Sequence, residues 1–312
     1  MKNHDIYLYG VIMQTNGFLL KHDFPKADSV CEIKEQYTLP GGETGMAAIV
    51  LNALGCKVKI DGNHLGKRTK DMLHDFYNKT NIDISALHYA PDHEGLEDYV
   101  MIDGSTRTIF STFAPYYDLW ERGILRWNTP AEEDIRAAKV AAIDPWYDKQ
   151  SIIVAGYCHK NGIPYVTIDV QPENEIAKHA SIIVTSGEYI RDHISDYHTP
   201  NNEKDGKIAL LKKYSEHTNA LVIITGGGGT TYYGRGGDVK ESNAYKVDVV
   251  STLCAGDVFK AGCVYSLLHG YGDDKTAQFA SALAAVACTK FPLALNPPKL
   301  DEVVRLMQSG KE

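Results

Sequence analysis

One stretch of the sequence, residues 251–268, combines a carboxylate with a helix start made of small residues. It reads Ser-Thr-Leu-Cys-Ala-Gly-Asp up to Asp257 and continues as a largely apolar segment. This pattern predicts a helix that begins near Ala255 and ends before Gly270. The first turn of a helix has backbone N–H groups without intrahelical partners and carries the positive end of the dipole. A phosphate could therefore bind at this turn.

A carboxylate beside an anion site is what phosphoryl transfer to a hydroxyl requires. Asp257 could accept the hydroxyl proton, while the amides of Ala255, Gly256 and Asp257 could stabilise charge on the phosphoryl group. We expect the helix dipole and the nearby amides to keep Asp257 ionised at neutral pH. A lone aspartate in a first turn is, however, more often only a favourable charge at the positive end of the dipole.

Two motifs resemble those of one enzyme family. The segment STLCAGDVFKAG resembles the DTxGAGDxFxxG signature of the PfkB (ribokinase-like) carbohydrate kinases, and residues 39–55 resemble their glycine-rich N-terminal signature. The motifs have the right order and separation. The resemblance implies an ATP-dependent phosphotransferase that acts on a hydroxyl of a sugar or sugar-like molecule. The alternatives are a nucleoside or vitamin-like alcohol kinase of the same fold, or a non-catalytic nucleotide-binding regulatory protein.

The resemblance also assigns residues to the transferred phosphate and to the nucleotide. It places Asp257 with Cys254, Ala255 and Gly256 in the catalytic group, where Cys254 replaces a glycine of the signature. It implies nucleotide contacts at Thr225, Gly227, Gly256 and Ser281, and a role for Glu188 in holding Mg²⁺ with the phosphates. The run Gly226–Gly229 lacks the G-x-G-x-x-G spacing, and the sequence has no GxxxxGK[ST] motif, so neither a dinucleotide fingerprint nor a P-loop is expected.

The acceptor positions depart from the pattern. Gly41 and Gly42 match the first motif, but Thr15 replaces the aspartate, and Met46 the asparagine, that grip sugar hydroxyls in the family. Thr and Met cannot clamp a diol as Asp and Asn do, so common hexoses and ribose are expected to be poor acceptors. Arg107 could reach an anionic substrate, although a solvated hairpin charge is the commoner explanation.

One further substitution concerns a cation site. Ser251 stands where the second motif opens with aspartate, which puts in doubt the monovalent-cation site that the family often builds there.

Helical and strand patterns alternate through most of the chain, which is typical of βαβ units. We therefore expect a doubly wound, mostly parallel α/β fold with helices on both faces, forming a single domain of residues 1–312. The expected strands are 6–12, 58–60, 86–89, 140–143, 165–169, 182–184, 221–225 and 230–233. The first expected helix is opened by Gly41 and Gly42, with Thr44 near its cap and 47–54 as its body. The other expected helices are 69–79, 130–139, 149–161, 174–180, 207–217, 255–268, 274–288 and a last helix that ends near 308.

Two segments fall outside this alternation. Residues 18–37 have no helical period, and Asp103-Gly104 lies between β-prone runs, which is a strong hairpin signal. Together they predict a small β lid formed by residues 14–40 and 93–113, with the aromatic side chains between 101 and 120 packed in the core or the lid. In the resembled family such a sheet covers the substrate and often joins a homodimer.

Composition narrows the classes of partner. The chain has 312 residues, 44% of them hydrophobic, and a formal net charge of −8, which argues against nucleic acid or an anionic membrane as the main partner. No apolar run approaches the roughly 20 residues of a membrane span. The six cysteines form no CxxC pair and the histidines no zinc motif, so a reduced, cytoplasmic protein without structural metal is expected.

Overall fold

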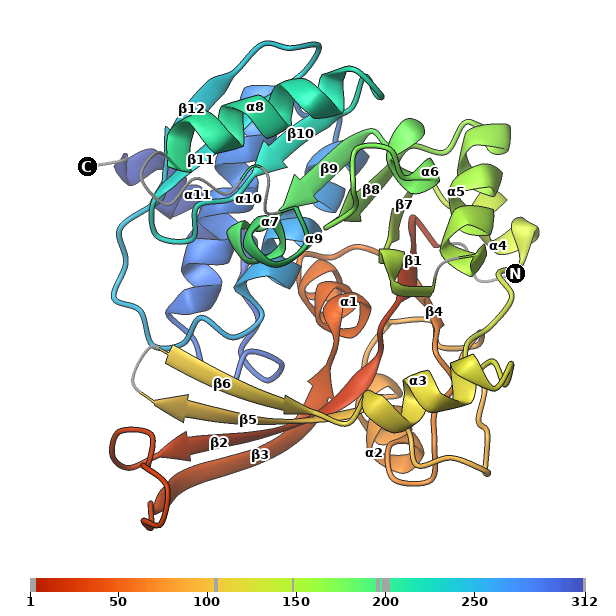
Figure 1. Ribbon diagram of the computed structural model, residues 1–312, viewed down its shortest axis with the longest axis vertical. Coiled ribbons are helices and arrows are strands. Elements are labelled where there is room, and N and C mark those ends of the chain that lie inside the picture. The colour runs from red at the N-terminus through yellow and green to blue at the C-terminus, as the bar shows by residue number, and fades with distance from the viewer. Residues whose placement is uncertain (1–3, 104–105, 148, 195–196, 198–202, 311–312) are drawn as a thin grey trace.

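The computed structural model describes residues 4–103, 106–147, 149–194, 197 and 203–310, and within them the strands form two sheets (Figure 1). The strands are β1 Ile6–Gly10, β2 Met13–Leu20, β3 Ile33–Gly41, β4 Val58–Gly62, β5 Glu97–Asp103, β6 Thr106–Ser111, β7 Val140–Ile143, β8 Tyr165–Ile168, β9 Ile182–Thr185, β10 Leu221–Ile224, β11 Thr230–Gly234 and β12 Lys240–Asn243. The helices are α1 Glu43–Ala53, α2 Lys70–Tyr77, α3 Ala114–Glu121, α4 Glu132–Arg136, the 3₁₀ turn Pro145–Tyr147, α5 Lys149–Asn161, α6 Glu175–Lys178, α7 Gly187–His193, α8 Glu203–Ser215, α9 Ala255–Leu268, α10 Asp273–Cys288 and α11 Leu300–Ser309.

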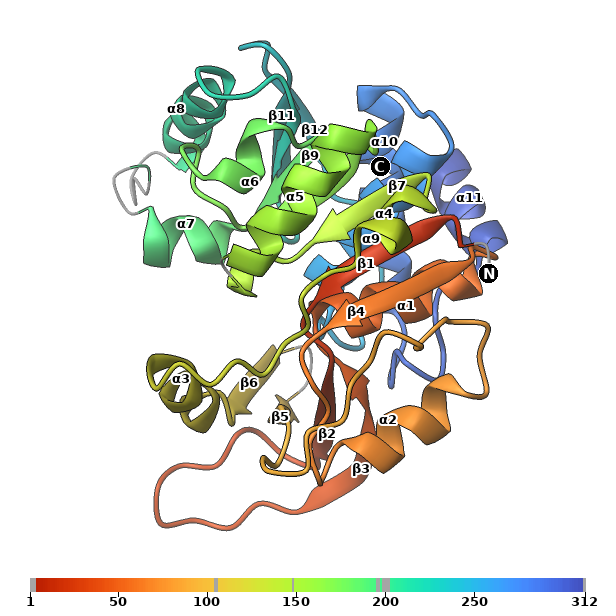
Figure 2. The ribbon, with the colours of Figure 1, turned by 90° about the vertical axis from the view of Figure 1, so that its right-hand side faces the viewer.

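The larger sheet has eight strands in the order β12-β11-β10-β9-β8-β7-β1-β4. The six strands from β10 to β4 are parallel, and β11 and β12 add an antiparallel edge. Helices α1, α9 and α10 cover one face, and α4, α5, α6 and α8 cover the other (Figure 2). This is the doubly wound fold that the alternation predicts.

The first strand shows why a continuous apolar run marks such a sheet. Ile6 and Leu8 pack into the core under α1 and α9, whereas Tyr7 and Tyr9 pack into the core on the opposite face. All four side chains are fully buried. Successive side chains of a strand point to opposite faces, so a strand covered on both sides cannot alternate with polar residues.

The strand order reverses direction at β1. The chain passes from β1 to β4 on one side of it, and β7 to β10 follow on the other side. In open α/β sheets, ligands bind outside the carboxyl ends of the strands at such a switch point. A ligand site is therefore expected at the residues that follow β1 and β7.

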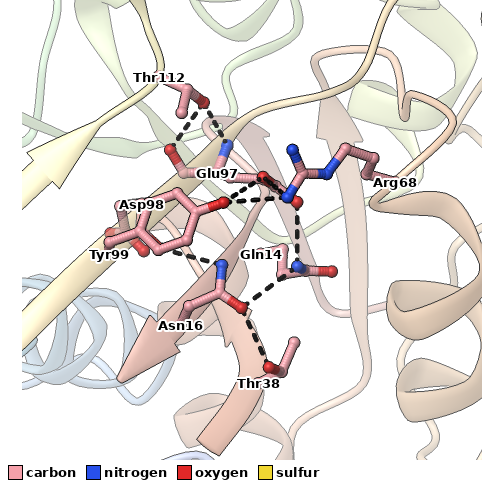
Figure 3. Close-up of polar contacts among 8 residues, drawn as sticks. All are labelled: Gln14, Asn16, Thr38, Arg68, Glu97, Asp98, Tyr99 and Thr112. Carbon is pink, nitrogen blue, oxygen red and sulfur yellow. Dashed lines mark hydrogen bonds and ion pairs between the residues drawn. The ribbon is translucent and has the colours of Figure 1, made fainter. Parts of the chain in front are cut away.

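The second sheet has four strands in the order β3-β2-β5-β6 and is called the lid sheet (Figure 1). Strands β5 and β6 pair as the predicted hairpin, with Asp103 opposite Thr106, and Gly104 lies outside the described residues. On one face of the sheet, polar side chains form hydrogen bonds and an ion pair with one another (Figure 3). Gln14 and Arg68 both bind the Glu97 carboxylate, at 3.0 and 3.1 Å.

Two predicted elements are wrong. Residues 86–89 form no strand, because among the described residues this segment makes only one isolated β-bridge, between Leu65 and Tyr89. The helix expected over 130–139 is only α4, five residues long. Its flanks leave the helix because Val140 must enter the sheet beside β1.

Small residues let α9 lie close to its neighbours. A Cβ added to Gly262 would come within 2.6 Å of the backbone of Ala280 in α10, so the two helices can touch only because glycine stands there. None of the described helices is long and apolar enough to cross a membrane.

Candidate active site

The N-terminus of α9 is open, as predicted. Cys254 precedes it with a φ of 65°, in the left-handed region that favours glycine. Within the described chain the amides of Gly256 and Asp257 have no hydrogen-bond acceptor, and a Cβ added to Gly256 would meet nothing within 4 Å. One expectation needs correction, because the Ala255 amide already donates to the Thr252 carbonyl at 3.2 Å. Two amides, not three, are therefore free to bind an anion.

Asp257 sits in the first turn of α9, and its environment differs from the expected one. Burial and, to a smaller extent, the Asp144 carboxylate raise the pKa of Asp257, whereas Lys260 and the Cys254 thiol lower it, and the resulting pKa is about 6. Desolvation thus outweighs the helix dipole that was expected to set this pKa. Asp257 is still mainly ionised at pH 7, and a pKa near the working pH suits a general base.

A buried ion pair lies beneath this turn. Lys260, one turn along α9 from Asp257, binds the Asp144 carboxylate, and the two side chains are 1% and 0% exposed. Asp144 directly follows β7. Its second oxygen accepts hydrogen bonds from the Val11 amide at 3.0 Å and from the Thr44 hydroxyl at 2.8 Å. The pair therefore ties α9 to the carboxyl ends of β1 and β7 and to the start of α1.

A third carboxylate belongs to the start of α1. The Trp146 indole N–H donates to both oxygens of Glu43, at 2.9 and 3.0 Å. Burial raises the pKa of Glu43 well above its usual value, and the charges of Asp144 and Asp257 raise it further, against the opposing effect of Lys260. Glu43, Asp144 and Asp257 thus form one electrostatic cluster with a single lysine among them.

A cavity of about 420 Å³ opens on the other side of Trp146. Asp169 and Tyr189 also line it, at the carboxyl end of β8 and in α7. Glu188, the predicted magnesium residue, lies in the first turn of α7. Burial, with a smaller contribution from the charge of Glu188, raises the pKa of the half-buried Asp169 to about 6. Among the described residues no three His, Cys, Asp or Glu side chains form a metal cluster.

Two of the predicted nucleotide residues, Thr225 and Gly227, lie between β10 and β11, whereas Ser281 lies within α10. Thr225 directly follows β10, and its amide donates to the Thr185 carbonyl at 2.9 Å. Gly227 has a φ of 58° in the turn that leads to β11, so the glycine run is a hairpin turn. Ser281 is partly exposed in α10, next to the close contact between α10 and α9.

The predicted acceptor residues gather between α1 and the lid sheet. Gly42 caps α1 with a φ of 82°, and a Cβ on Gly41 would come within 1.9 Å of the Thr15 hydroxyl. Thr15 and the buried Met46 line a small cavity together with Cys254. Arg107, on β6, donates from Nη1 to the Thr252 hydroxyl at 3.2 Å.

This contact brings the lid sheet against the segment that precedes α9. The Arg107 charge also lowers the pKa of Asp257, so Arg107 lies in the electrostatic reach of the site and is not merely a solvated hairpin charge. Ser251, at the doubtful cation site, accepts a hydrogen bond from the Leu253 amide at 3.2 Å and so helps to form the turn before α9.

Sequence reasoning did not single out Glu43, Asp98, Asp144, Asp169 or Lys260. Two of them carried a usable signal. Asp144 is a charged residue immediately after a fully apolar strand, where α/β sites are built, and Lys260 is a lone lysine inside an apolar helix, where an unpaired charge would be costly. The proximity of the others to Asp257 depends on the tertiary fold.

Comparisons with known proteins agree with this architecture. Residues 3–300 match the sequence profile of the pfkB family carbohydrate kinase. A 5-dehydro-2-deoxygluconokinase of Shouchella clausii is 29% identical over 127 residues, which cover 41% of this chain and 37% of that protein. The protein of the same name from Clostridium perfringens is 22% identical over 306 residues, which cover 87% of this chain and 85% of that protein.

The solved structures establish the fold. Arabidopsis thaliana ribokinase, complexed with ribose and ATP, superposes with a TM-score of 0.76 at 16% identity and covers 98% of this chain and 99% of its own. The first four curated relatives are matched over only 33–40% of their own length.

Proposed function

The chain belongs to the pfkB family of carbohydrate kinases, and we propose that it transfers the γ-phosphoryl group of ATP to a hydroxyl of a sugar or sugar-like acceptor. The observation that carries this proposal is the N-terminus of α9. There a carboxylate with a pKa of about 6 stands beside the two amides of Gly256 and Asp257 that have no acceptor in the described chain.

In the proposed reaction Asp257 removes the proton of the acceptor hydroxyl. The hydroxyl oxygen then attacks the γ-phosphorus, the bond from that phosphorus to the β-bridging oxygen breaks, and ADP leaves with the bonding electrons. The free amides stabilise the charge on the phosphoryl oxygens. The Cys254 thiol lies close enough to Asp257 to lower its pKa, and it therefore favours the ionised base.

The buried pair beneath the turn has a supporting role. Asp144 holds Lys260 in place, and the Lys260 charge favours the ionised form of Asp257. Because Asp144 also binds the Val11 amide and the Thr44 hydroxyl, the same pair fixes the distance between the base and the start of α1. Asp257 is thereby held in position before an acceptor binds.

The site has the small number of carboxylate ligands that a Mg²⁺ ion bound to ATP requires. Mg²⁺ is commonly held by one or two carboxylates together with waters and substrate phosphates. Glu188 and Asp169 provide two neighbouring carboxylates beside the cavity, so we assign the ion to them. When bound, Mg²⁺ would neutralise charge on the phosphates of ATP. Thr225 and Gly227 would contact the nucleotide, and Ser281 stays a prediction.

The acceptor class follows from the relatives. Two relatives carry the name 5-dehydro-2-deoxygluconokinase, so we propose a sugar acid of that kind as the first acceptor to test. A homodimer through the lid sheet and a cytoplasmic location stay predictions. The lid sheet would close over the acceptor and exclude water.

The test is release of ADP in the presence of single acceptors. We would screen 5-dehydro-2-deoxygluconate, D-ribose, D-fructose and inosine, and then compare Asp257→Asn with the parent. General-base catalysis contributes about 10²–10⁴-fold, so kcat should fall by that order while ATP affinity, measured by calorimetry, changes little. The matched control is Asp301→Asn, because Asp301 is also a first-turn aspartate, in α11, and is exposed.

Each outcome decides between the hypotheses. Turnover of inosine alone would identify a nucleoside kinase of this fold. ATP binding without turnover of any acceptor would favour a regulatory protein. If Asp257→Asn keeps kcat within a few-fold of the parent, Asp257 is only a capping charge and the proposed mechanism is wrong.

A further inference from the structure

Thr15 does not stand alone on its face of the lid sheet. Strands β2 and β5 are parallel, and their register places Asp98 directly opposite Thr15. Side chains that face each other in register lie on the same side of a sheet. The Thr15 hydroxyl lies close enough to the Asp98 carboxyl to lower its pKa. A carboxylate therefore lies one strand away from the position where a threonine weakens the expected grip on the acceptor.

One oxygen of this carboxylate is unsatisfied. Asp98 is only 9% exposed, and its Oδ1 is buried without a hydrogen-bond partner in the described chain. The neighbours on the other face of the sheet differ, since Gln14, Asn16 and Glu97 all bind one another or nearby groups (Figure 3). Asn16 reaches only the backbone oxygen of Asp98, at 3.3 Å. Buried polar atoms nearly always have a partner, and a bare carboxylate oxygen is costly.

The unsatisfied oxygen belongs to the face of the lid that covers the site. Thr15 lines a cavity with Met46 of α1 and with Cys254 at the start of α9. The charge of Asp98 acts on the Cys254 thiol, and the charge of Asp257 acts on Asp98. Burial and the charge of Asp257 raise the pKa of Asp98, whereas the Thr15 hydroxyl lowers it, and the resulting pKa is about 6. Asp98 is therefore within electrostatic reach of Asp257 and shares its face of the sheet with Thr15, which lines this cavity.

We propose that Asp98 binds the acceptor, its Oδ1 accepting hydrogen bonds from hydroxyl groups other than the one that is phosphorylated. The ligand class is a polyhydroxylated small molecule, because a carboxylate without a partner requires donors and hydroxyl groups supply them without adding charge. This inference rests on the proposed function and specifies which residue selects the acceptor. It also explains how a site with Thr15 on β2 can hold a sugar-like molecule.

The first test separates KM from kcat. Asp98→Asn keeps the shape but replaces a charged acceptor of hydrogen bonds with a neutral amide. With 5-dehydro-2-deoxygluconate, D-ribose or D-fructose as acceptor, whichever the parent phosphorylates, KM for the acceptor should rise by about 10- to 100-fold. KM for ATP should stay within about 2-fold, because the nucleotide binds elsewhere.

A swap and a control sharpen this test. Thr15→Asp combined with Asp98→Thr moves the carboxylate one strand across on the same face, and it should recover much of the acceptor affinity. Glu94→Gln is the matched control, since Glu94 is an exposed lid carboxylate whose contact is a 3.4 Å ion pair with Lys67. An unchanged acceptor KM in Asp98→Asn would overturn the inference and leave the kinase proposal standing.

A binding measurement keeps the two proposals apart. About 10 mM of each acceptor, added without ATP, should raise the Tm of the parent but not that of Asp98→Asn. Asp98→Asn itself should be at least as stable as the parent, because it removes a buried charge. A less stable variant with an unchanged acceptor KM would show a purely structural role. Binding that depends on Asp98 without any turnover would reject the kinase proposal alone, and no binding and no turnover would reject both.

Discussion

Replacing Lys260 with methionine is the substitution with the clearest expected consequences. Methionine has a similar length and suits an apolar helix interior, but it removes the positive charge that binds the Asp144 carboxylate. Both side chains are essentially inaccessible, at 1% and 0% exposure. The surviving carboxylate cannot be reached by water without a rearrangement of α9.

The size of the effect follows from the contacts of Asp144. Its Oδ2 keeps the Val11 amide at 3.0 Å and the Thr44 hydroxyl at 2.8 Å, whereas Oδ1 loses its only described partner. Removing one member of a buried ion pair typically costs about 3–5 kcal/mol. Because two hydrogen bonds remain, we expect about 3 kcal/mol, which is a large part of the roughly 5–15 kcal/mol that stabilises a protein.

The same substitution should change the pH profile of the enzyme. Lys260 is the largest influence that lowers the pKa of Asp257. Without it the pKa of Asp257 rises, so a smaller fraction of the base is ionised at any given pH. The acidic limb of kcat should therefore move to higher pH in Lys260→Met.

Urea unfolding followed by circular dichroism, together with kcat between pH 5 and 9, measures both effects. The double variant Asp144→Asn with Lys260→Met should be more stable than Lys260→Met alone, since it no longer buries an unpaired charge. Lys207→Met is the matched control, because Lys207 is 7% exposed but its partner Glu203 is 67% exposed and can be resolvated. Unchanged unfolding and an unchanged acidic limb in Lys260→Met would refute the assigned role of the pair.

The remaining predictions concern the base, the lid and the packing of α9 and α5. In the parent, kcat should fall as pH drops through about 6, because Asp257 must be ionised to act as a base. Because the pKa of Asp257 is raised in the folded protein, ionisation of this carboxyl lowers the free energy of unfolding as pH rises toward 7. Asp257→Asn should therefore be no less stable than the parent at pH 7. Arg107→Ala loses the hydrogen bond to the segment before α9 and should raise ATP hydrolysis without acceptor, measured as ADP release. Gly262→Ala should lower stability to urea by about 1–3 kcal/mol, since its Cβ would lie 2.6 Å from the backbone of α10. Gly156→Ala in α5, where a Cβ meets nothing within 4 Å, should instead be stabilising by about 0.5–1 kcal/mol.

The sequence predicts much of the main sheet because periodicity reports burial directly. Helices α5 and α9 and strand β7 have the predicted limits, since each combines a strong apolar pattern with clear ends. Of residues 86–89 only Tyr89 favours a strand by type, and strand pairing requires a neighbour, whereas this segment makes only an isolated bridge. Helix α3 was not predicted, because its aromatic residues indicate packing without a clear helical period.

The site was predictable only where its chemistry is local. The α9 start is local, so a short motif and its resemblance to the family signature could identify Asp257 and its neighbours. The pKa of Asp257 could not, because it depends on burial and on Asp144, which is more than a hundred positions away in the chain. Asp98 escaped notice for the same reason, since only the register of β5 against β2 places it beside Thr15.

The hydrogen bond between Trp146 and Glu43 makes the site optically observable. The chain has three tryptophans, and Trp127 stacks on Tyr147 at 5.1 Å while Trp120 packs edge-on against Trp127. Trp146 lies apart from them, 39% exposed, with its indole N–H on a carboxylate and its ring at the mouth of the cavity. With Trp120 and Trp127 replaced by phenylalanine, the tryptophan emission of the protein would come from Trp146 beside the cavity. Ligand entry could then be followed in real time without a label.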